Sequence, residues 1–447
     1  MIISIKTVGI IGAGPAGIAT AIRLKQHNID VVLFEANKKN QITIGEHLAA
    51  EALHELKKLE IPDTILTQHS IPCLEIQNAW GSSTIHHNES IFNPFGDSYV
   101  LSRPNFDNAL LQHCKEIGIE VQSGVRINGI KKTESGWNLV SKTKNFNVKF
   151  IIDASGRTSK FNFGQTKHEK LQLNSLIGIT KHLTSSEVFS AQKSYVLVES
   201  TKNGWWYTTQ IASGKMISTF MTDPRIISKY KNSQSDFWNE ELAKTVHTKE
   251  RLYPFTINSI IYTQSAHSQI AKQIQGTTWL KVGDAAQSFD PLSSAGIIKG
   301  LKMGISAADA IHKYISGDSE SLIQYEEATK FQYEEYQQKR NEYYVKELRW
   351  NHAPFWYYRN LRVKEIQTFS ISPISSYKII DENIEEKIAF LSIQLPEINF
   401  NTLINSIQQL SLIKDAVALY LRKENQKQMN PWFLHALESL KIIGIVA

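Results

Sequence analysis

Two short apolar runs near the N-terminus flank a stretch with helical periodicity. Thr7–Ile11 and Asp30–Glu35 have the continuous apolar character of buried strands, whereas Pro15–Gln26 repeats apolar residues at helical spacing. The order strand, helix, strand predicts a parallel pair joined by a crossover helix, and continuously apolar strands indicate a sheet that is buried on both faces. We therefore expect the chain to begin with an α/β domain.

The pattern changes in the middle of the chain and then changes back. Ser175–Ile261 alternates polar and apolar residues, with an amphipathic stretch at Ser233–Val246, which predicts an antiparallel sheet with one helix. A buried-strand pattern returns at Trp279–Asp284 and leads into a long helix at Gly296–Tyr314. The first domain is therefore expected to be discontinuous, with the antiparallel sheet inserted. The other predicted elements are helices at Ala49–Leu59 and Pro104–Glu116, short strands within Pro72–Val100, and strands of the first sheet at Ile119–Gln122 and Lys149–Ala154.

The last quarter of the chain has a different character. Beyond Leu322 the sequence keeps helical spacing almost to its end, and Pro354, Pro373 and Pro396 mark breaks between helices. The tail Phe433–Ala447 is apolar, and a free tail rarely carries that much apolar surface, so we expect it to dock on the body of the protein. We therefore expect a C-terminal helical region.

Composition narrows the class of protein. Of the 447 residues 42% are hydrophobic and 21% charged, as in a compact folded protein. Cys73 and Cys114 are the only cysteines, too few for a disulfide framework and in keeping with a reducing compartment. The net charge of +6 is a small excess for this length, and no apolar run reaches the ~18 residues of a membrane span. We expect a cytoplasmic protein with no membrane span and no nucleic-acid partner.

A glycine-rich segment follows the first strand and opens the first helix. In this context Gly12 permits a tight turn, Gly14 lets a pyrophosphate approach the backbone, and Gly17 lets the helix pack closely on the strand. We count Ala16 among the cofactor-binding positions of this turn. Glu35 ends the second strand, about 20 residues beyond the glycines, where a carboxylate can accept hydrogen bonds from ribose hydroxyls. These residues predict a bound dinucleotide.

A second segment with candidate chemistry is Gly283–Ile297. Asp284 follows a predicted strand and can accept a hydroxyl proton from a polyol chain. A loop of small residues that contains Pro291 then enters a helix at Gly296 and Ile297. The amides of this helix N-terminus could hold the pyrimidine end of an isoalloxazine ring and stabilise negative charge on reduced flavin.

Together the two segments resemble the FAD-binding motifs of flavoprotein monooxygenases related to p-hydroxybenzoate hydroxylase and to flavin-dependent halogenases. Leu101–Leu110 is similar to the family segment in which an arginine before a helix contacts FAD, and this assigns Arg103 to the cofactor. Ile151–Ser159 is similar to the family's Asp-Gly region, and Val125 matches the position where backbone groups meet adenine. The resemblance covers roughly residues 1–330.

The resemblance implies a discontinuous Rossmann-like FAD-binding domain with an inserted substrate sheet. It also implies an FAD-dependent monooxygenase that hydroxylates an electron-rich aromatic ring through a flavin hydroperoxide, with electrons from NAD(P)H or from reduced flavin supplied by a flavin reductase. The expected division is residues 1–72, 103–171 and 267–330 for the FAD-binding domain, residues 73–102 and 172–266 for the substrate sheet, and residues 331–447 for the helical region.

A narrower resemblance concerns the substrate. Gly45–His47, Ala79–Gly81, Asn93–Gly96 and Tyr343–Arg359 are similar to flavoproteins that mature tryptophylquinone amine oxidases by oxygenating a tryptophan of their partner protein. The subgroup's usual Gly-Trp-x-Leu-Asp-Arg differs here, because Asp97–Arg103 lacks the tryptophan and the aspartate. A tryptophan carried by a protein or peptide is therefore one candidate substrate, and a free small aromatic compound is the other.

Two alternative functions remain open. A halogenase would need a pocket lysine and a Trp-x-Trp-x-Ile-Pro segment, but no lysine lies between Lys58 and Lys115, and Gly204–Tyr207 is the nearest match to the segment. A non-catalytic flavoprotein or partner-binding module is the other alternative, because the aromatic and basic stretch Arg349–Arg362 has the composition of an interface.

Candidate catalytic residues lie in the segments expected to border the cavity. His47 could act as an acid or base near neutral pH, as could His86 and His87. Trp205 lies in a predicted strand of the inserted sheet, whose alternate members would face the flavin. We include Pro291, in the loop before the second helix, as the third catalytic candidate. We expect no metal.

Overall fold

The computed structural model describes residues 8–36, 45–90, 93–163, 170–172, 175–184, 194–228, 230, 233–360, 399–400, 402–403 and 405. Residues 1–355 form one compact unit and residues 356–447 a second. The elements discussed below belong to the first unit, except that α10 (Pro354–Asn360) crosses the division.

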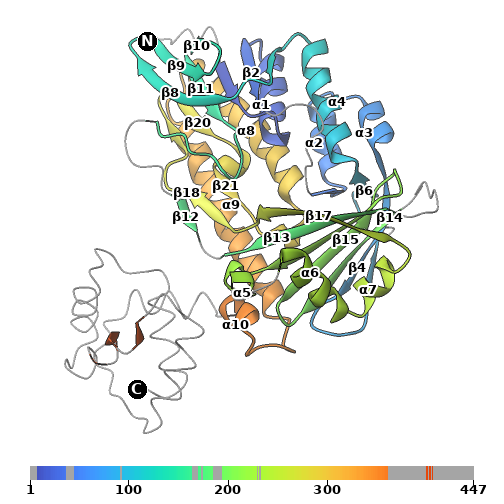
Figure 1. The fold of residues 1–447 in the computed structure, drawn as a ribbon. Helices are drawn as coiled ribbons and strands as arrows, with labels where there is room; N and C mark the ends of the chain where they lie inside the picture. Colours follow the sequence, from blue (N-terminus) through green and yellow to red (C-terminus); the bar gives the residue numbers. More distant parts are fainter. Residues whose placement is uncertain are drawn as a thin grey trace. The chain divides into compact units, whose positions relative to one another are not determined.

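A six-stranded sheet in the order β19-β20-β11-β1-β2-β7 organises the first unit (Figure 1). β1 lies between β2 and β11 and pairs in parallel with both. On the outer sides, β2 pairs in parallel with β7 and β11 with β20, whereas β19 is antiparallel to β20. The predicted β-α-β start and the discontinuous Rossmann-like sheet are confirmed, since β20 comes from much later in the chain. The strands are β1 (Val8–Ile11), β2 (Val31–Glu35), β7 (Glu120–Ser123), β11 (Phe150–Asp153), β19 (Gln275–Gly276) and β20 (Trp279–Lys281).

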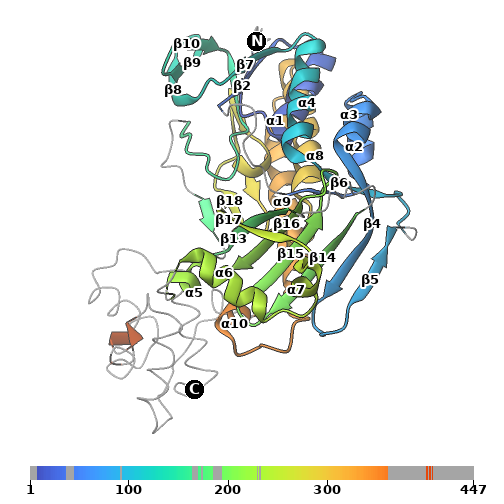
Figure 2. The same cartoon turned by 45° about the vertical axis from the view of Figure 1, so that its right-hand side comes forward.

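Both faces of this sheet are covered, as its apolar strands require. One face shares a hydrophobic core with α1 (Pro15–Gln26), α4 (Arg103–Glu116) and α8 (Gly296–Ile315). The opposite face packs on a three-stranded antiparallel sheet, β8 to β10, which Figure 2 shows on the side away from α1 and α8. The sequence analysis did not predict this small sheet, whose strands are β8 (Ile127–Thr133), β9 (Gly136–Ser141) and β10 (Asn145–Val148).

The inserted sheet is nine-stranded, with the order β17-β13-β16-β15-β14-β4-β6-β3 and β5 paired to β4. The predicted antiparallel pairing is confirmed from β13 to β17, but β4 runs parallel to β14, so the whole sheet is mixed. Its strands are β3 (His47–Leu48), β4 (Ser70–Ala79), β5 (His86–Glu89), β6 (Ser98–Leu101), β13 (Ile177–Thr184), β14 (Ser194–Thr201), β15 (Gly204–Gln210), β16 (Met216–Thr222) and β17 (Thr256–Ser265).

Several shorter elements complete the first unit. They are α2 (Ala52–Lys58), α3 (Asp63–His69), α5 (Pro224–Ser228), α6 (Gln234–Ala243), α7 (His247–Leu252), the 3-10 turns η2 (Gly283–Ala285) and η3 (Pro291–Ser293), and a sheet of β12 (Lys170–Gln172), β18 (Gln269–Ala271) and β21 (Gln287–Ser288). Trp206 and Phe220 of the large sheet form a hydrophobic cluster with Trp238 of α6. This cluster covers the face of the sheet opposite to Trp205.

One long helix, α9 (Ser321–Tyr344), follows α8 (Figure 1). It runs without a break through residue 331, where the C-terminal helical region was expected to begin. α9 ends at Tyr344 and α10 begins at Pro354, so the break predicted at Pro354 is confirmed. The breaks expected at Pro373 and Pro396 and the tail Phe433–Ala447 lie outside the described residues. Among the described helices, none combines the length and the apolar character that crossing a bilayer requires.

Candidate active site

The glycine-rich turn has the geometry that a dinucleotide requires. Gly12 has a φ of 107°, and a Cβ there would lie 2.4 Å from the carbonyl oxygen of Ala154. A Cβ on Gly17 would lie 1.9 Å from the carbonyl oxygen of Gly12, so only glycine lets the helix pack this closely on the strand. By contrast, no atom lies within 4 Å of a Cβ built on Gly14. The backbone at Gly14 is therefore open to a ligand.

Glu35 and Val125 lie beside this turn. One carboxylate oxygen of Glu35 accepts a hydrogen bond of 2.9 Å from the amide of Ala13. Glu35 pairs with Ser123 across the two neighbouring strands, and Val125 follows two residues later, packed against the cluster that contains Phe34. The structure therefore brings the predicted ribose-binding and adenine-binding positions to one edge of the parallel sheet.

Ala16 has a packing role in the structure. Its methyl group lies 2.6 Å from where a Cβ on Gly283 would be, and its carbonyl oxygen 2.5 Å from a Cβ built on Gly304. Small residues at these positions let α8 approach the first turns of α1. The N-terminal end of α1 is thereby held against both η2 and α8.

Asp284 lies between two cations. Its Oδ1 is 2.6 Å from Nζ of Lys299, and its Oδ2 is 3.1 Å from Nε of Arg157. Lys299 also donates to the carbonyl oxygen of Gln287 and lies over the ring of Phe289. Burial lowers the pKa of Lys299, although the neighbouring Asp284 acts in the opposite direction. The carboxylate predicted to meet the ribityl chain is thus fixed from two sides.

Lys299 was not among the site residues expected from the sequence. The helix that begins at Gly296 is apolar in its first turn and a half except for Lys299, and Lys302 follows in the next turn. A charged residue so close to an apolar helix start was the sign in the sequence that could have identified Lys299. Gly296 begins α8 and has no atom within 4 Å of a Cβ built on it, so the backbone there is accessible. Ile297 is buried beside it.

The loop before α8 is tied to the large sheet. Pro291 begins η3, and the preceding Asp290 accepts a hydrogen bond of 2.7 Å from the hydroxyl of Tyr344. That hydroxyl in turn accepts one of 3.1 Å from the indole nitrogen of Trp205 in β15. Arg340 pairs with the same carboxylate at 3.2 Å. The catalytic candidates Pro291 and Trp205 are therefore linked through Tyr344.

Arg103 is the first residue of α4, one residue before the predicted helix start at Pro104, and is buried. Its Nη1 donates to the carbonyl oxygen of Gly45 at 2.8 Å, and its Nε and Nη2 contact the carboxylate of Asp107 at 3.2 and 3.1 Å. It thus holds the segment that carries Glu46 and His47 against the start of α4.

Glu46 and His47 are buried, and no hydrogen bond of good geometry reaches either side chain from the described residues. The amides of Gly45 and Glu46 and the side chain of Tyr207 nevertheless lie close enough to Glu46 to act on its pKa. Burial lowers the pKa of His47 to about 4, which leaves the imidazole neutral at pH 7 and makes it a weak base there. Burial raises the pKa of Glu46 to about 7, opposed by backbone amides and by Arg103. Glu46 was not among the candidate site residues expected from the sequence, because the residues next to it in the chain do not indicate that a glutamate is buried.

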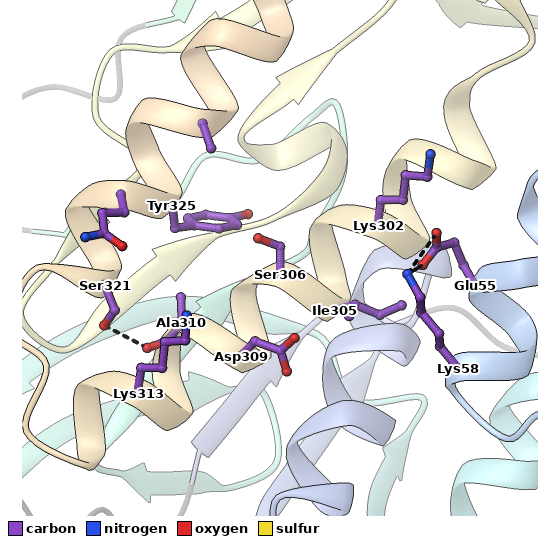
Figure 3. Close-up of a pocket in the computed structure, with 12 residues that line it drawn as sticks. Glu55, Lys58, Lys302, Ile305, Ser306, Asp309, Ala310, Lys313, Ser321 and Tyr325 are labelled. Carbon is purple, nitrogen blue, oxygen red and sulfur yellow. Dashed lines mark hydrogen bonds and ion pairs between the residues drawn. The ribbon is translucent and has the colours of Figure 1, made fainter.

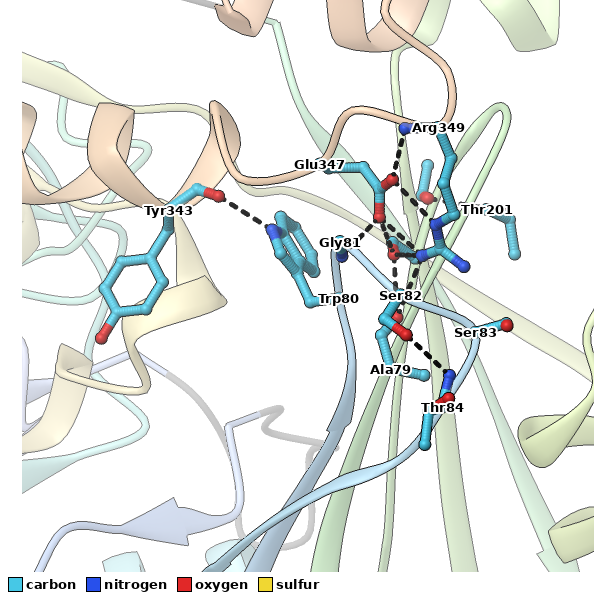
Figure 4. Close-up of polar contacts among 12 residues, drawn as sticks. Ala79, Trp80, Gly81, Ser82, Ser83, Thr84, Thr201, Tyr343, Glu347 and Arg349 are labelled. Atoms are coloured by element: carbon cyan, nitrogen blue, oxygen red, sulfur yellow. Dashed lines mark hydrogen bonds and ion pairs between the residues drawn. The ribbon is translucent and has the colours of Figure 1, made fainter.

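Residues of the narrower resemblance meet in one hydrogen-bonded cluster (Figure 4). Glu347 is fully buried and accepts hydrogen bonds from the amide of Gly81 at 2.8 Å, the hydroxyl of Ser200 at 2.6 Å and the guanidinium of Arg349 at 2.6 Å. The indole nitrogen of Trp80 donates to the carbonyl oxygen of Tyr343 at 2.8 Å. This cluster fixes the chain after α9 to the turn that follows β4.

A separate pocket lies among α2, α8 and α9 (Figure 3), with a volume of about 610 Å³. Lys58, Lys302 and Lys313 line it, together with Glu55 and Asp309. None of the predicted site residues belongs to its lining, so we do not assign the cofactor or the substrate to it.

The residues present fit FAD. The open backbone at Gly14 and Gly296 gives two helix N-termini that can receive negative charge. Glu35 ends β2 and Asp284 lies in η2, and their carboxylates are the acceptors that the sequence predicts for ribose and ribityl hydroxyls. The individual contacts of these residues with FAD stay predictions.

Comparison with known proteins identifies the family. Residues 6–334 match the FAD binding domain family. Over 364 residues the chain is 29% identical to LodB of Marinomonas mediterranea, named as an FAD-dependent oxidoreductase, and the match covers 78% of this chain and 96% of LodB. Over 339 residues it is 24% identical to the flavin-dependent halogenase armH5 of Armillaria mellea, covering 68% of this chain and 64% of armH5, slightly less than two thirds of that halogenase.

Solved structures show the same fold at low sequence identity. The peptidyl tryptophan dihydroxylase QhpG, described as essential for tryptophylquinone cofactor biogenesis, has a TM-score of 0.66 at 19% identity, covering 83% of this chain and 82% of QhpG. The myxobacterial chondrochloren halogenase CndH has a TM-score of 0.72 at 17% identity, covering 93% of this chain and 96% of CndH.

Proposed function

The chain belongs to the FAD binding domain family and is an FAD-dependent oxidoreductase, and from that premise we propose that it is a monooxygenase that hydroxylates an electron-rich aromatic ring. In the proposed reaction one atom of O₂ enters the ring and the other leaves as water, while NAD(P)H, directly or through a flavin reductase, supplies two electrons. Bound FAD would supply the activation of oxygen.

One observation carries the proposal. Trp205 of the large sheet, Tyr344 of α9 and Asp290 of the loop before α8 form a continuous hydrogen-bonded chain. It joins the sheet to the loop that enters the helix expected at the flavin. An aromatic substrate held under this sheet would lie beside the loop, and the packed aromatic groups would exclude water from it.

The side chains of the site have distinct roles in this proposal. The amides at the start of α1 would hold the pyrophosphate, and Glu35 would hold the ribose of the adenosine. Asp284 would orient the ribityl chain, and the amides of Gly296 and Ile297 would receive negative charge on the reduced ring. Arg103 would contribute by fixing the segment that follows Gly45. We keep the domain division expected from the sequence as part of this proposal.

Hydroxylation is favoured over halogenation by the buried lysines. In the described part of the chain, Lys181, Lys281 and Lys299 are the buried lysines, and each donates hydrogen bonds to protein groups. None of these three ammonium groups is available to a hypohalous acid. Halogenation is nevertheless the second candidate function, because halogenases such as armH5 are among the relatives.

We further propose that the ring is a tryptophan side chain presented by a protein or peptide. The support is the cluster of Gly81, Glu347 and Arg349, which joins two segments of the narrower resemblance, and the activity described for the structural neighbour QhpG. The aromatic and basic segment Trp350–Arg362 would help to dock such a partner. Phe355, Trp356 and Arg359 are buried, so the contacts would have to come from the other residues of this segment. A free small aromatic compound is the competing substrate.

The test uses the FAD-loaded protein with reduced flavin, O₂ and matched sets of substrates. Tryptophan-containing peptides would be compared with free tryptophan, indoles and phenols, with and without chloride or bromide. Addition of oxygen to a peptide tryptophan, independent of halide, is the expected result. A halogenated product that requires added halide would establish the second candidate, and efficient turnover of a free compound alone would refute the peptide substrate.

A further inference from the structure

Asp290, in the loop before α8, is held at three points by one face of α9. Its backbone amide donates a hydrogen bond of 2.6 Å to the hydroxyl of Tyr336. Its Oδ2 accepts hydrogen bonds from the hydroxyl of Tyr344 at 2.7 Å and from Nε of Arg340 at 3.2 Å. The three residues of α9 follow one another at intervals of four, so they lie on the same face of the helix. Asp290 is 1% exposed, and a buried network of this kind fixes the position of its members.

The loop that follows Asp290 has a backbone conformation that its own residues do not favour. Oδ1 of Asp290 accepts a hydrogen bond of 3.0 Å from the amide of Leu292, which starts η3. Ser294 then has a φ of 49° and a ψ of 19°, in the left-handed region that residues with a branched or unbranched side chain rarely adopt. Such a conformation persists where the surrounding structure imposes it. The contacts that α9 makes with Asp290 are a restraint of this kind.

A stacked ring pair adds a fourth contact between the same two segments. The rings of Phe289 and Tyr336 lie 3.8 Å apart between centroids, with an angle of 2° between their planes. Arg340 also lies over the ring of Tyr344, at 4.4 Å from the centroid, so the groups that hold Asp290 are packed on one another. The match to the FAD binding domain family ends at residue 334, and the three residues of α9 all lie beyond it.

The conformation of this loop decides how α8 begins. Only Ala295 separates Ser294 from Gly296, the first residue of α8. The backbone at Ser294 therefore sets the direction of the first amides of the helix. Stabilisation of a charge by amides depends on donors that are aimed at it in advance. The oxidised ring of FAD is neutral, whereas addition of two electrons and one proton gives an anion, so these amides would act mainly on the reduced form.

We propose that Tyr336, Arg340 and Tyr344 are positioning residues for the flavin, which act through Asp290 on the first amides of α8 and so stabilise reduced FAD relative to oxidised FAD. The inference rests on the proposed function, which places Gly296 and Ile297 at the reduced ring. It deepens that function, because it gives a part of α9 beyond the family match a role in the redox chemistry of the cofactor.

The experiment measures the midpoint potential of FAD bound to the full-length protein, by anaerobic reductive titration against a reference dye. Tyr336→Phe removes the acceptor for the amide of Asp290, and Tyr344→Phe removes a donor to its carboxylate. Neither substitution changes a charge, so a shift cannot come from a direct Coulombic effect. Each should reduce the preference for reduced over oxidised FAD by about fivefold, which lowers the midpoint potential by ~20 mV for a two-electron couple.

Tyr325→Phe is the matched control on the same helix. Tyr325 is also buried, but its hydroxyl donates a hydrogen bond of 3.1 Å to the carbonyl oxygen of Lys281 in β20, a strand fixed by its pairing with β11. This variant loses the same kind of hydrogen bond and should leave the midpoint potential unchanged. Melting temperature and FAD absorbance verify that each variant folds and binds the cofactor, and Tyr336→Phe decides alone if Tyr344→Phe does not fold.

Three results would overturn the proposal. The first is an unchanged potential in Tyr336→Phe and Tyr344→Phe, and the second is an equal shift in Tyr325→Phe. The third is a shift in Tyr344→Phe alone, because Tyr344 also accepts a hydrogen bond from Trp205 and the effect would then come from the sheet. The measurement contains no substrate, so unchanged potentials together with oxygenation of an aromatic compound would refute the positioning role and leave the proposed function intact.

Discussion

Replacing Glu46 by glutamine should stabilise the FAD-free protein at alkaline pH and leave its stability unchanged at acid pH. The carboxyl group is buried, and the cost of desolvating its charge outweighs the effect of the neighbouring amides, Arg103 and Tyr207, so the folded state favours its protonated form. In the unfolded chain the same group ionises at its ordinary pKa. Glutamine resembles the protonated carboxyl group in shape and is neutral at every pH.

The magnitude follows from the two pKa values. The pKa of Glu46 rises from 4.5 to about 7 on burial, and each pKa unit is worth ~1.4 kcal/mol, so full ionisation removes about 3 kcal/mol of stability. Below 4.5 the group is protonated in both states and makes no difference. Between the two values the folded state keeps a proton that the unfolded state has lost, and stability falls as the pH rises through about 7. Above that range the loss is complete.

The assay is a urea denaturation of both proteins across this pH range, with the difference in the free energy of unfolding plotted against pH. The difference should rise from near zero at acid pH to about 3 kcal/mol in favour of Glu46→Gln above neutral pH. Other groups cancel because both proteins contain them.

Glu347→Gln is a control with the opposite sign. Burial acts to raise the pKa of Glu347, but the hydrogen bonds from Arg349, Ser200 and Gly81 outweigh it and lower the pKa. The ionised group therefore stabilises the folded state above its ordinary pKa, and this stability is lost as the pH falls through the lowered value. Glu347→Gln should destabilise the protein at neutral pH and do so less at acid pH. A flat difference for Glu46→Gln, or one that follows the Glu347 control in sign, would refute the reasoning about burial.

Three further outcomes are expected. Lys299→Met should weaken FAD binding by about tenfold or more in a fluorescence titration, because it removes one charged partner of Asp284, a contact of ~1.5–3 kcal/mol. Lys302→Met on the same helix should leave FAD binding unchanged, and equal effects of the two substitutions would contradict the role assigned to Lys299. Glu35→Ala should weaken FAD binding through loss of the proposed ribose contacts, and unaltered binding would remove Glu35 from the site. Gly304→Ala should destabilise the fold by ~1–3 kcal/mol in thermal unfolding, since its Cβ would lie 2.5 Å from a backbone oxygen of α1, and an unchanged melting temperature would mean that the two helices can separate without loss.

The sequence alone determined the parts of this protein that depend on local pattern. Continuous apolar strands, the helical spacing after Pro15 and the glycines at positions 12, 14 and 17 were sufficient to predict the β-α-β unit and its dinucleotide turn, because each depends on neighbours within a few residues. The return of a buried strand at Trp279 likewise predicted the insertion. These features follow from hydrophobic periodicity and from the residue types at turns, and both can be seen in a single sequence.

Only the tertiary structure decided which polar groups are paired and which are isolated. Lys299 becomes a partner of Asp284, and Glu347 becomes the acceptor for Gly81, through contacts between segments that are far apart in the chain. Glu46 differs from these two residues, because the cost of burying its charge outweighs the groups around it and raises its pKa. The parallel pairing of β4 with β14 and the sheet of β8 to β10 were also beyond local pattern. Burial and hydrogen bonding depend on the packing of whole elements, and that packing sets the pKa values and the chemistry of the site.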